Sequence, residues 1–260
     1  MTASDIIRTS VAEVNALRTR AAQVPALYHA VRAVKAFQAT RFRATYADLL
    51  ATPRFEPAVL FFLNELYSDK DYTQRDAQFV RIAGPLERLF PASVVDTAVA
   101  MAQLHAITER LDSAMAQAWL DTGAAPGAGS GGTLSATDYV QAWRQVGARE
   151  GRDFQLATVL RVGQDLVEFT RKRGLRTLLR MMRPAARASG LGALQSFLEA
   201  GFDTFSAMSQ DGQTAHTFLG YIRDREGALL HTLYADTELA SAVAALTGSA
   251  APAVQTLQNQ

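Results

Sequence analysis

Apolar side chains recur three or four residues apart along almost the whole chain, and this spacing is the period of an α-helix. The strict alternation of apolar and polar residues that marks a half-buried strand is never sustained over six residues. The sequence therefore predicts an all-α fold, a multi-helix bundle. The stretch 94–119 is an example, because one helical face carries Val94, Ala98, Met101, Leu104, Leu111, Met115 and Ala118.

Helix boundaries follow from where this spacing starts and stops. Pro184 should bend a helix or end its hydrogen bonding. Three pairs resemble N-terminal caps: Thr73 with Asp76, Ser93 with Asp96, and Ser135 with Asp138. We expect about ten helices, over residues 4–22, 26–50, 56–67, 74–89, 93–121, 136–150, 153–172, 175–187, 191–208 and 214–234.

One glycine-rich segment, 123–132, interrupts the helical pattern and predicts a flexible, dispensable connection. A chain of 260 residues allows one or two domains. The expected layout is an N-terminal helical half (1–122), a linker (123–133), a C-terminal helical half (134–247) and a frayed tail (248–260). The halves form either one layered bundle or two units joined by the linker.

The composition is that of a globular protein, with 48% hydrophobic and 20% charged residues. The absence of cysteine excludes disulfides, thiol nucleophiles and thiolate metal sites. The longest run of large apolar residues, Val59–Leu63, is far too short to span a membrane. Residues 1–14 lack the features of a signal peptide, so a cytoplasmic location is expected.

The densest apolar stretch, 55–67, predicts a central helix whose apolar surface covers most of its circumference. Glu65 lies beside Phe61 and Phe62 in this helix, where an unpaired carboxylate would be costly. Two interpretations remain: an acid with a raised pKa, or a structural ion pair. Partners for the ion pair are offered downstream by Arg75, Asp76 and Arg81.

The segment 61–67, FFLNELY, resembles the motif of the proteobacterial proteins named for FFLEELY, with Asn64 in place of the first Glu. Further similarity lies in Arg75-Asp76, in 89–91, in 197–202 and in Arg225-Glu226, so the resemblance spans roughly residues 55–234. The resemblance implies a bacterial protein and no particular activity. Asn64 also weakens any proposal of a paired-carboxylate site.

The stretch 170–198 contains only basic charges, and five of them form one helical stripe, which we call the Arg stripe: Arg173, Arg176, Arg180, Arg183 and Arg187. Such a stripe fits an anionic membrane surface, an anionic group on a small ligand or, least well, a nucleic-acid backbone. The structural alternative is neutralisation by Glu168, Glu199 or Asp203. We expect at least two of Arg176, Arg180 and Arg183 to have no acidic partner, and expect no nucleic-acid partner.

Two further candidate features lie in the C-terminal part of the chain. A regular seam over 191–208 contains Gly201, which allows either close helix contact or room for an apolar ligand. Glu226 stands on the core line of the last long helix and needs an arginine, for which the Arg stripe is the expected supplier. The apolar-ligand candidates are Phe61, Phe62, Met182, Phe197, Gly201 and Phe205.

The four histidines show no compact metal-ligand spacing, so no metal or cofactor is predicted. His105 is a weak candidate for a haem ligand, and Glu109, one turn on, offers it an ordinary partner instead.

The favoured function is a non-catalytic helical binding protein for an apolar ligand with an anionic end, such as an acyl or isoprenoid phosphate or a phospholipid, or for an anionic membrane surface. The binding hypothesis requires an apolar cavity or groove bordered by arginines. The alternatives are an enzyme that uses buried Glu65 or Glu226 as acid or base, and a haem-binding protein. Peripheral membrane contact and a homodimer are both left open.

Overall fold

The protein is all-α in the computed structural model, which describes residues 1–66, 70–123, 133–172, 174–208, 213–235 and 238–247. Within these ranges it has no strand, which confirms the predicted fold class. The helices are α1 (Ala3–Gln23), α2 (Pro25–Thr45), α3 (Ala47–Leu50), α4 (Glu56–Glu65), α5 (Thr73–Leu89), α6 (Ala92–Asp121), α7 (Ala136–Val146), α8 (Arg149–Arg171), α9 (Leu175–Ala188), α10 (Gly192–Met208), α11 (Thr214–Tyr234) and α12 (Leu239–Leu246).

Ten of these helices correspond to the ten predicted segments. The predicted helix 26–50 is wrong in one respect, because it breaks at Tyr46, whose side chain is fully buried. The predicted helix 136–150 ends early, since Gly147 and Ala148 both adopt positive φ angles. Helix α9 continues through Pro184, and α12 was not predicted.

Two of the expected caps differ from the structure. Ser135 accepts a hydrogen bond from the backbone N–H of Asp138, as predicted for α7. At α6 the cap position is occupied by Pro91 rather than Ser93, and at α5 by Tyr72, with Asp71 accepting from the Thr73 N–H. Helices α5, α6 and α7 start within one residue of the expected positions all the same, because the apolar periodicity fixes them, whereas α8 starts at Arg149, four residues before the expected position.

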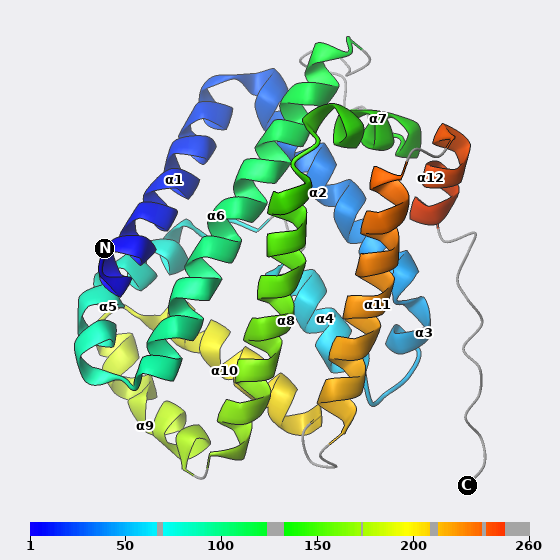
Figure 1. The fold of residues 1–260 in the computed structure, drawn as a ribbon. Coiled ribbons are helices and arrows are strands. Elements are labelled where there is room, and N and C mark those ends of the chain that lie inside the picture. The colour runs from blue at the N-terminus through cyan, green and yellow to red at the C-terminus, as the bar shows by residue number, and fades with distance from the viewer. Residues whose placement is uncertain (67–69, 124–132, 173, 209–212, 236–237, 248–260) are drawn as a thin grey trace, which may run out of the picture.

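The long helix α6 lies at the centre of the bundle and packs against α1, α2, α7 and α8. Helix α10 crosses beneath it and contacts α4, α5, α8 and α9 (Figure 1). Two large hydrophobic clusters fill the interior, one around Trp119 and Trp143 and one around Phe42, Phe62 and Phe218. No helix within the described ranges is both long and apolar enough to cross a membrane.

Both large clusters combine residues from before and after the glycine-rich segment. The described helices therefore share their cores across this segment. Separate folding of 1–122 and 134–247 stays a prediction. Most of the linker (124–132) and the tail (248–260) lie outside the described residues.

Candidate functional site

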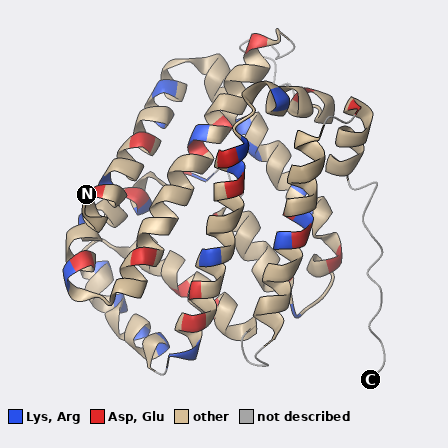
Figure 2. Cartoon of the chain, in the orientation of Figure 1, with Lys and Arg blue, Asp and Glu red and all other residues tan. Residues whose placement is uncertain are grey.

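Helix α9 carries the Arg stripe at the edge of the molecule. Ala186 is the only buried residue of this helix, which packs mainly along α10. Figure 2 shows basic residues and no acidic ones on α9, at the lower left of the view. The helix is thus attached to the bundle along one narrow side.

Two members of the stripe have acidic partners on α10. The Arg176 Nε lies 2.9 Å from Asp203 Oδ1, and the Arg183 Nε lies 2.6 Å from Glu199 Oε1. The expectation that two of the three central arginines would lack acidic partners is therefore wrong. The physical reason is that α10 lies along α9 and presents Glu199 and Asp203 to it. Arg176 and Arg183 are two turns apart and the two carboxylates one turn apart, so the long arginine side chains span the difference. Both side chains of the Arg176–Asp203 pair are exposed to solvent, whereas in the second pair Arg183 is exposed and Glu199 is partly buried.

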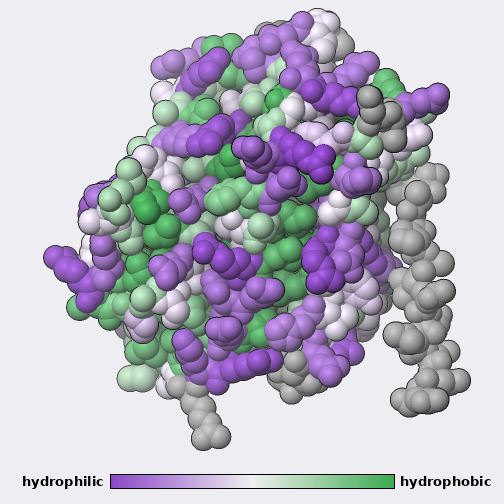
Figure 3. All heavy atoms as spheres, viewed as in Figure 1, coloured by the Kyte–Doolittle hydropathy of each residue, from purple (hydrophilic) through white to green (hydrophobic). Residues whose placement is uncertain are grey.

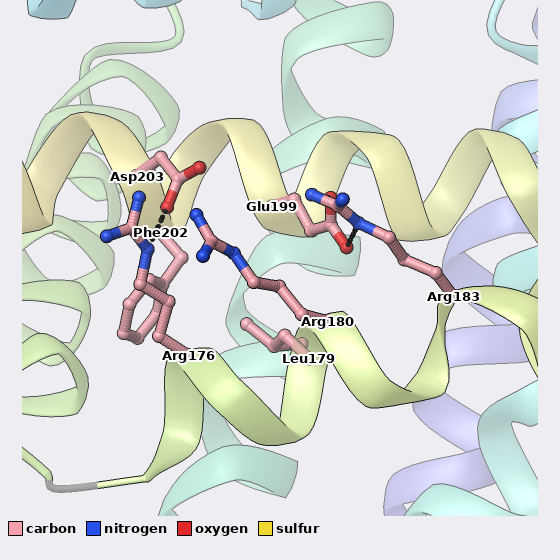
Figure 4. Close-up of a pocket in the computed structure, with 7 residues that line it drawn as sticks. All are labelled: Arg176, Leu179, Arg180, Arg183, Glu199, Phe202 and Asp203. Carbon is pink, nitrogen blue, oxygen red and sulfur yellow. Dashed lines mark hydrogen bonds and ion pairs between the residues drawn. The ribbon is translucent and has the colours of Figure 1, made fainter.

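Arg180 extends between the two pairs toward α10 (Figure 4). Within the described part of the chain, neither Arg180 nor Arg187 forms an ion pair. A hydrogen bond from Arg183 lowers the pKa of Glu199, and the charge of Arg180 adds to this effect. Arg173 lies outside the described residues.

The surface around the Arg stripe is a shallow depression rather than a cavity. Figure 4 shows its lining, which consists of Arg176, Leu179, Arg180, Arg183, Glu199, Phe202 and Asp203. The side chains that line the depression enclose essentially no volume between them. The arrangement does not provide the arginine-bordered cavity that a buried acyl chain requires.

Five of the six apolar-ligand candidates pack against neighbouring side chains instead. Phe61 stacks on Phe197 with ring centroids 6.1 Å apart, and a Cβ atom on Gly201 would lie 3.3 Å from the Phe61 ring. Phe62 and Phe205 are buried in the second cluster. Gly201 therefore allows close contact between α10 and α4 and does not leave room for an apolar ligand. Met182, the sixth candidate, is exposed on α9, away from this cluster.

Glu226 is nearly buried and paired, as predicted, but with a different arginine. Its Oε1 accepts hydrogen bonds from Arg41 Nη1 at 2.6 Å and from the Tyr46 hydroxyl at 3.0 Å. The Arg stripe, which was the expected supplier, is wrong, because α9 packs mainly against α10 and the arginine that reaches Glu226 comes from α2.

Glu65 also forms ion pairs. Its carboxylate lies 3.4 Å from Arg75 Nη1 and 3.8 Å from Lys70 Nζ. The Arg75 guanidinium stacks over the rings of Tyr72 and Phe197, and burial lowers its pKa. The other two proposed partners, Asp76 and Arg81, contact neither oxygen of Glu65; Arg81 donates to the backbone carbonyl of Ser189. The geometry agrees with the structural-ion-pair interpretation.

The imidazole of His105 faces a carboxylate rather than an open pocket. Its Nε2 lies 3.0 Å from Asp76 Oδ2 and 3.3 Å from Arg18 Nη2. The proposed partner Glu109 contacts Lys35 instead, at 2.5 Å. The nitrogen that would bind a haem iron is therefore engaged in this cluster. Within the described residues no group of three His, Asp or Glu side chains could hold a metal ion.

A buried polar cluster continues from Lys35 and was missed in the sequence. Gln38 donates to Asp112, which is 1% exposed, and burial raises the pKa of Asp112. Arg152 stacks over the Trp143 ring at 4.2 Å, and its Nη2 has no hydrogen-bond partner among the described residues. The signal in the sequence is weak, because Asp112 appears only as one charge on a long helix.

Comparisons with known proteins give one match. A family model described as "Domain of unknown function (DUF8198)" matches residues 17–240. No curated protein and no solved structure matches the chain.

Proposed function

We propose that this chain, which belongs to the DUF8198 family, is a non-catalytic binding protein that docks on anionic membrane surfaces through α9. Of the two ligand types expected from the sequence, a lipid surface is better supported than an enclosed apolar ligand. One observation carries the proposal. Three large apolar side chains are exposed on the helix that bears the Arg stripe, namely Leu178 (49%), Met181 (73%) and Met182 (38%).

These apolar side chains lie on a different flank of α9 from the arginines. Leu178 and Met181 are three residues apart and therefore neighbours on the helix surface. By the 3.6-residue helical repeat they lie on the side of α9 opposite the Arg stripe. A helix with one apolar face and one basic face is typical of helices that lie in the plane of the membrane interface. Complete burial of a Leu or Met side chain contributes about 1.5–3 kcal/mol. These side chains stay exposed to water in the folded protein. Their insertion into a membrane would therefore contribute a favourable free energy of burial to binding.

The arginines supply the electrostatic term. A basic side chain near an anionic leaflet contributes about 1 kcal/mol. Arg180 and Arg187 form no ion pair within the described chain, so their charges add to the attraction of α9 toward an anionic leaflet. Arg176 and Arg183 can exchange their carboxylates for phosphates, because exposed ion pairs contribute only about 0–1 kcal/mol.

The proposal includes the finer expectations from the sequence. They are a cytoplasmic location, a bacterial source and kinship with the proteins named for FFLEELY, which rests on the segment 61–67. Figure 3 shows hydrophobic and hydrophilic residues intermixed over the lower left of the molecule, where Figure 1 places α5 and α9.

Co-sedimentation with vesicles tests the proposal. We expect the protein to sediment with phosphatidylcholine vesicles that contain phosphatidylserine, and to be released as salt is raised. Leu178→Ser with Met181→Ser should weaken binding, and Arg180→Gln with Arg187→Gln should weaken it further. All four side chains are exposed, so these variants should fold.

A matched control is Arg161→Gln, an exposed arginine on α8 that lies outside the proposed face. Its binding should equal that of the unmodified protein. If the α9 variants bind vesicles as strongly as the unmodified protein, the membrane contact lies on another part of the surface. No binding to anionic vesicles at low salt would refute the function.

A further inference from the structure

Helix α10 places two carboxylates against the Arg stripe on α9. The Arg183 Nε lies 2.6 Å from Oε1 and 2.7 Å from Oε2 of Glu199, so both carboxylate oxygens hold this guanidinium group. The Arg176 Nε lies 2.9 Å from Asp203 Oδ1. Four arginines of the stripe lie within the described residues, and two of them are thus neutralised from within the protein. Half of the described positive charge of the stripe is therefore occupied.

Gln195 holds Glu199 in this position. Its side-chain Nε2 donates one hydrogen bond to Glu199 Oε1, at 2.8 Å, and one to the backbone carbonyl of Leu179 on α9, at 2.7 Å. Gln195 is only 8% exposed, so this link between α9 and α10 is shielded from water. The hydrogen bond from Arg183, together with the one from Gln195, lowers the pKa of Glu199 against the opposing effect of burial. The carboxylate therefore stays charged at neutral pH.

The ion pairs also draw the Arg stripe away from the apolar side chains of α9. Figure 4 shows the side chains of Arg176, Arg180 and Arg183 directed toward α10. Leu178 and Met181, the two most exposed large apolar residues of the helix, lie on the opposite side of α9 by the helical repeat. A membrane that takes up these apolar side chains therefore has to compete with α10 for the arginines.

The carboxylates of α10 and the phosphates of lipids compete for the same groups. Both are anions that accept hydrogen bonds from the planar guanidinium group. The carboxylates belong to the same chain, so their effective concentration at the stripe is high and does not change on dilution. Both side chains of the Arg176–Asp203 pair are exposed, and such a pair contributes little to folding. Its larger effect is on how tightly the stripe binds other anions.

We infer that Glu199 and Asp203 form an autoinhibitory contact, which occupies the Arg stripe in the absence of a membrane and keeps docking weak and reversible. The inference rests on the function proposed above and adds the regulation of the same site. Glu199→Gln with Asp203→Asn removes both negative charges and retains side chains of the same size. This double variant should bind anionic vesicles about tenfold more tightly, because each released basic side chain adds to the attraction toward an anionic leaflet.

The chain offers a control with the same change in net charge. Asp153→Asn with Asp224→Asn also removes two exposed carboxylates. The first pairs with Arg149 at the start of α8, and the second pairs with Arg223 on α11. This control should sediment with vesicles of phosphatidylcholine and phosphatidylserine as the unmodified protein does. Asp203→Asn alone should give an intermediate affinity, and it decides the question if thermal unfolding shows that the α10 double variant does not fold.

A soluble anion separates this inference from the proposed function. Titration calorimetry with tripolyphosphate measures access to the arginines without a membrane. The Glu199→Gln, Asp203→Asn variant should bind tripolyphosphate several-fold more tightly than the unmodified protein and the control. No tripolyphosphate binding by any of these proteins, or equal affinities of the variant and the control for tripolyphosphate or for vesicles, would overturn the inference. Tighter tripolyphosphate binding by the variant without vesicle binding by any protein would refute the membrane function and retain the competition between α10 and other anions.

Discussion

Gln38 Nε2 donates a hydrogen bond of 3.0 Å to Oδ1 of Asp112, and this amide and the ammonium group of Lys35, 3.9 Å away, are the carboxyl group's partners. Burial raises the pKa of Asp112, and the nearby charge of Lys35 only partly offsets the effect. A carboxyl group in this position is more easily protonated in the folded chain than in the unfolded chain. The stability of the folded chain should therefore depend on pH through this buried carboxyl group.

The sign of this linkage can be tested with Asp112→Asn. Because the folded pKa is raised, the contribution of Asp112 to stability is complete below its unfolded pKa and is lost as pH rises through the folded pKa. The unmodified protein should therefore lose stability relative to Asp112→Asn between acidic and mildly alkaline pH. Urea unfolding midpoints of both proteins measure this difference. Parallel pH profiles would show that the carboxyl group titrates alike in both states.

Asp76 should show the opposite dependence. Burial raises the pKa of this carboxyl group, but the hydrogen bond and charge of His105 and the charge of Arg18 outweigh burial, so the net pKa is lowered. Its stabilising contribution is present above the unfolded pKa and is lost as pH falls through the folded pKa. Asp76→Asn should cost roughly 3 kcal/mol at pH 7. The deficit should shrink below about pH 5, and a deficit that persists there would contradict the assignment.

The pair of Arg41 and Glu226 predicts a large loss from a single deletion. Glu226→Ala should lower the free energy of unfolding by roughly 3–5 kcal/mol, because it removes the carboxylate from a guanidinium that is 9% exposed. Asp48→Ala is the matched control, since Asp48 pairs with Arg225 at 2.7 Å but is 44% exposed. The control should cost less than about 1 kcal/mol. Similar losses in both variants would argue against a buried pair.

The sequence predicted the helices well and their partners poorly, for one physical reason. Apolar spacing tells which face of a helix is buried, and this placed Glu226 on a core line correctly. Spacing carries no information on which helix covers that face. The partner of Glu226 is therefore Arg41, 185 residues away, and not a member of the Arg stripe.

The same limit explains the site residues. Glu199 and Asp203 were named as partners of the stripe, but their register against Arg183 and Arg176 depends on how α9 lies along α10. Asp112 was missed because helix α6 is covered on several sides, so a polar residue anywhere on it can be buried. The break at Tyr46 was missed because the apolar pattern continues through it.

The glycine-rich segment supplies a prediction from composition alone. Ordering of glycine costs more backbone entropy than ordering of other residues, and such a segment has few side chains to pack. Shortening of 123–132 to four residues should therefore change the unfolding midpoint little. Circular dichroism during thermal unfolding checks this. A large loss of stability would assign the segment a role in the folded structure.

The contact between α8 and α11 gives the last prediction. A Cβ atom on Gly163 would lie 2.5 Å from Cδ2 of Leu219, a side chain that is buried in the second cluster. Gly163→Ala should therefore destabilise the protein by about 1–3 kcal/mol, although alanine is the better helix former. Gly192→Ala, where nothing lies within 4 Å of the added atom, should be neutral or stabilising.

A double variant tests whether the clash is with Leu219. Because Leu219→Ala removes the clashing methyl group, the double variant Gly163→Ala, Leu219→Ala should lose less stability than the sum of the two single losses. Additive losses would mean that the two helices do not meet at this glycine.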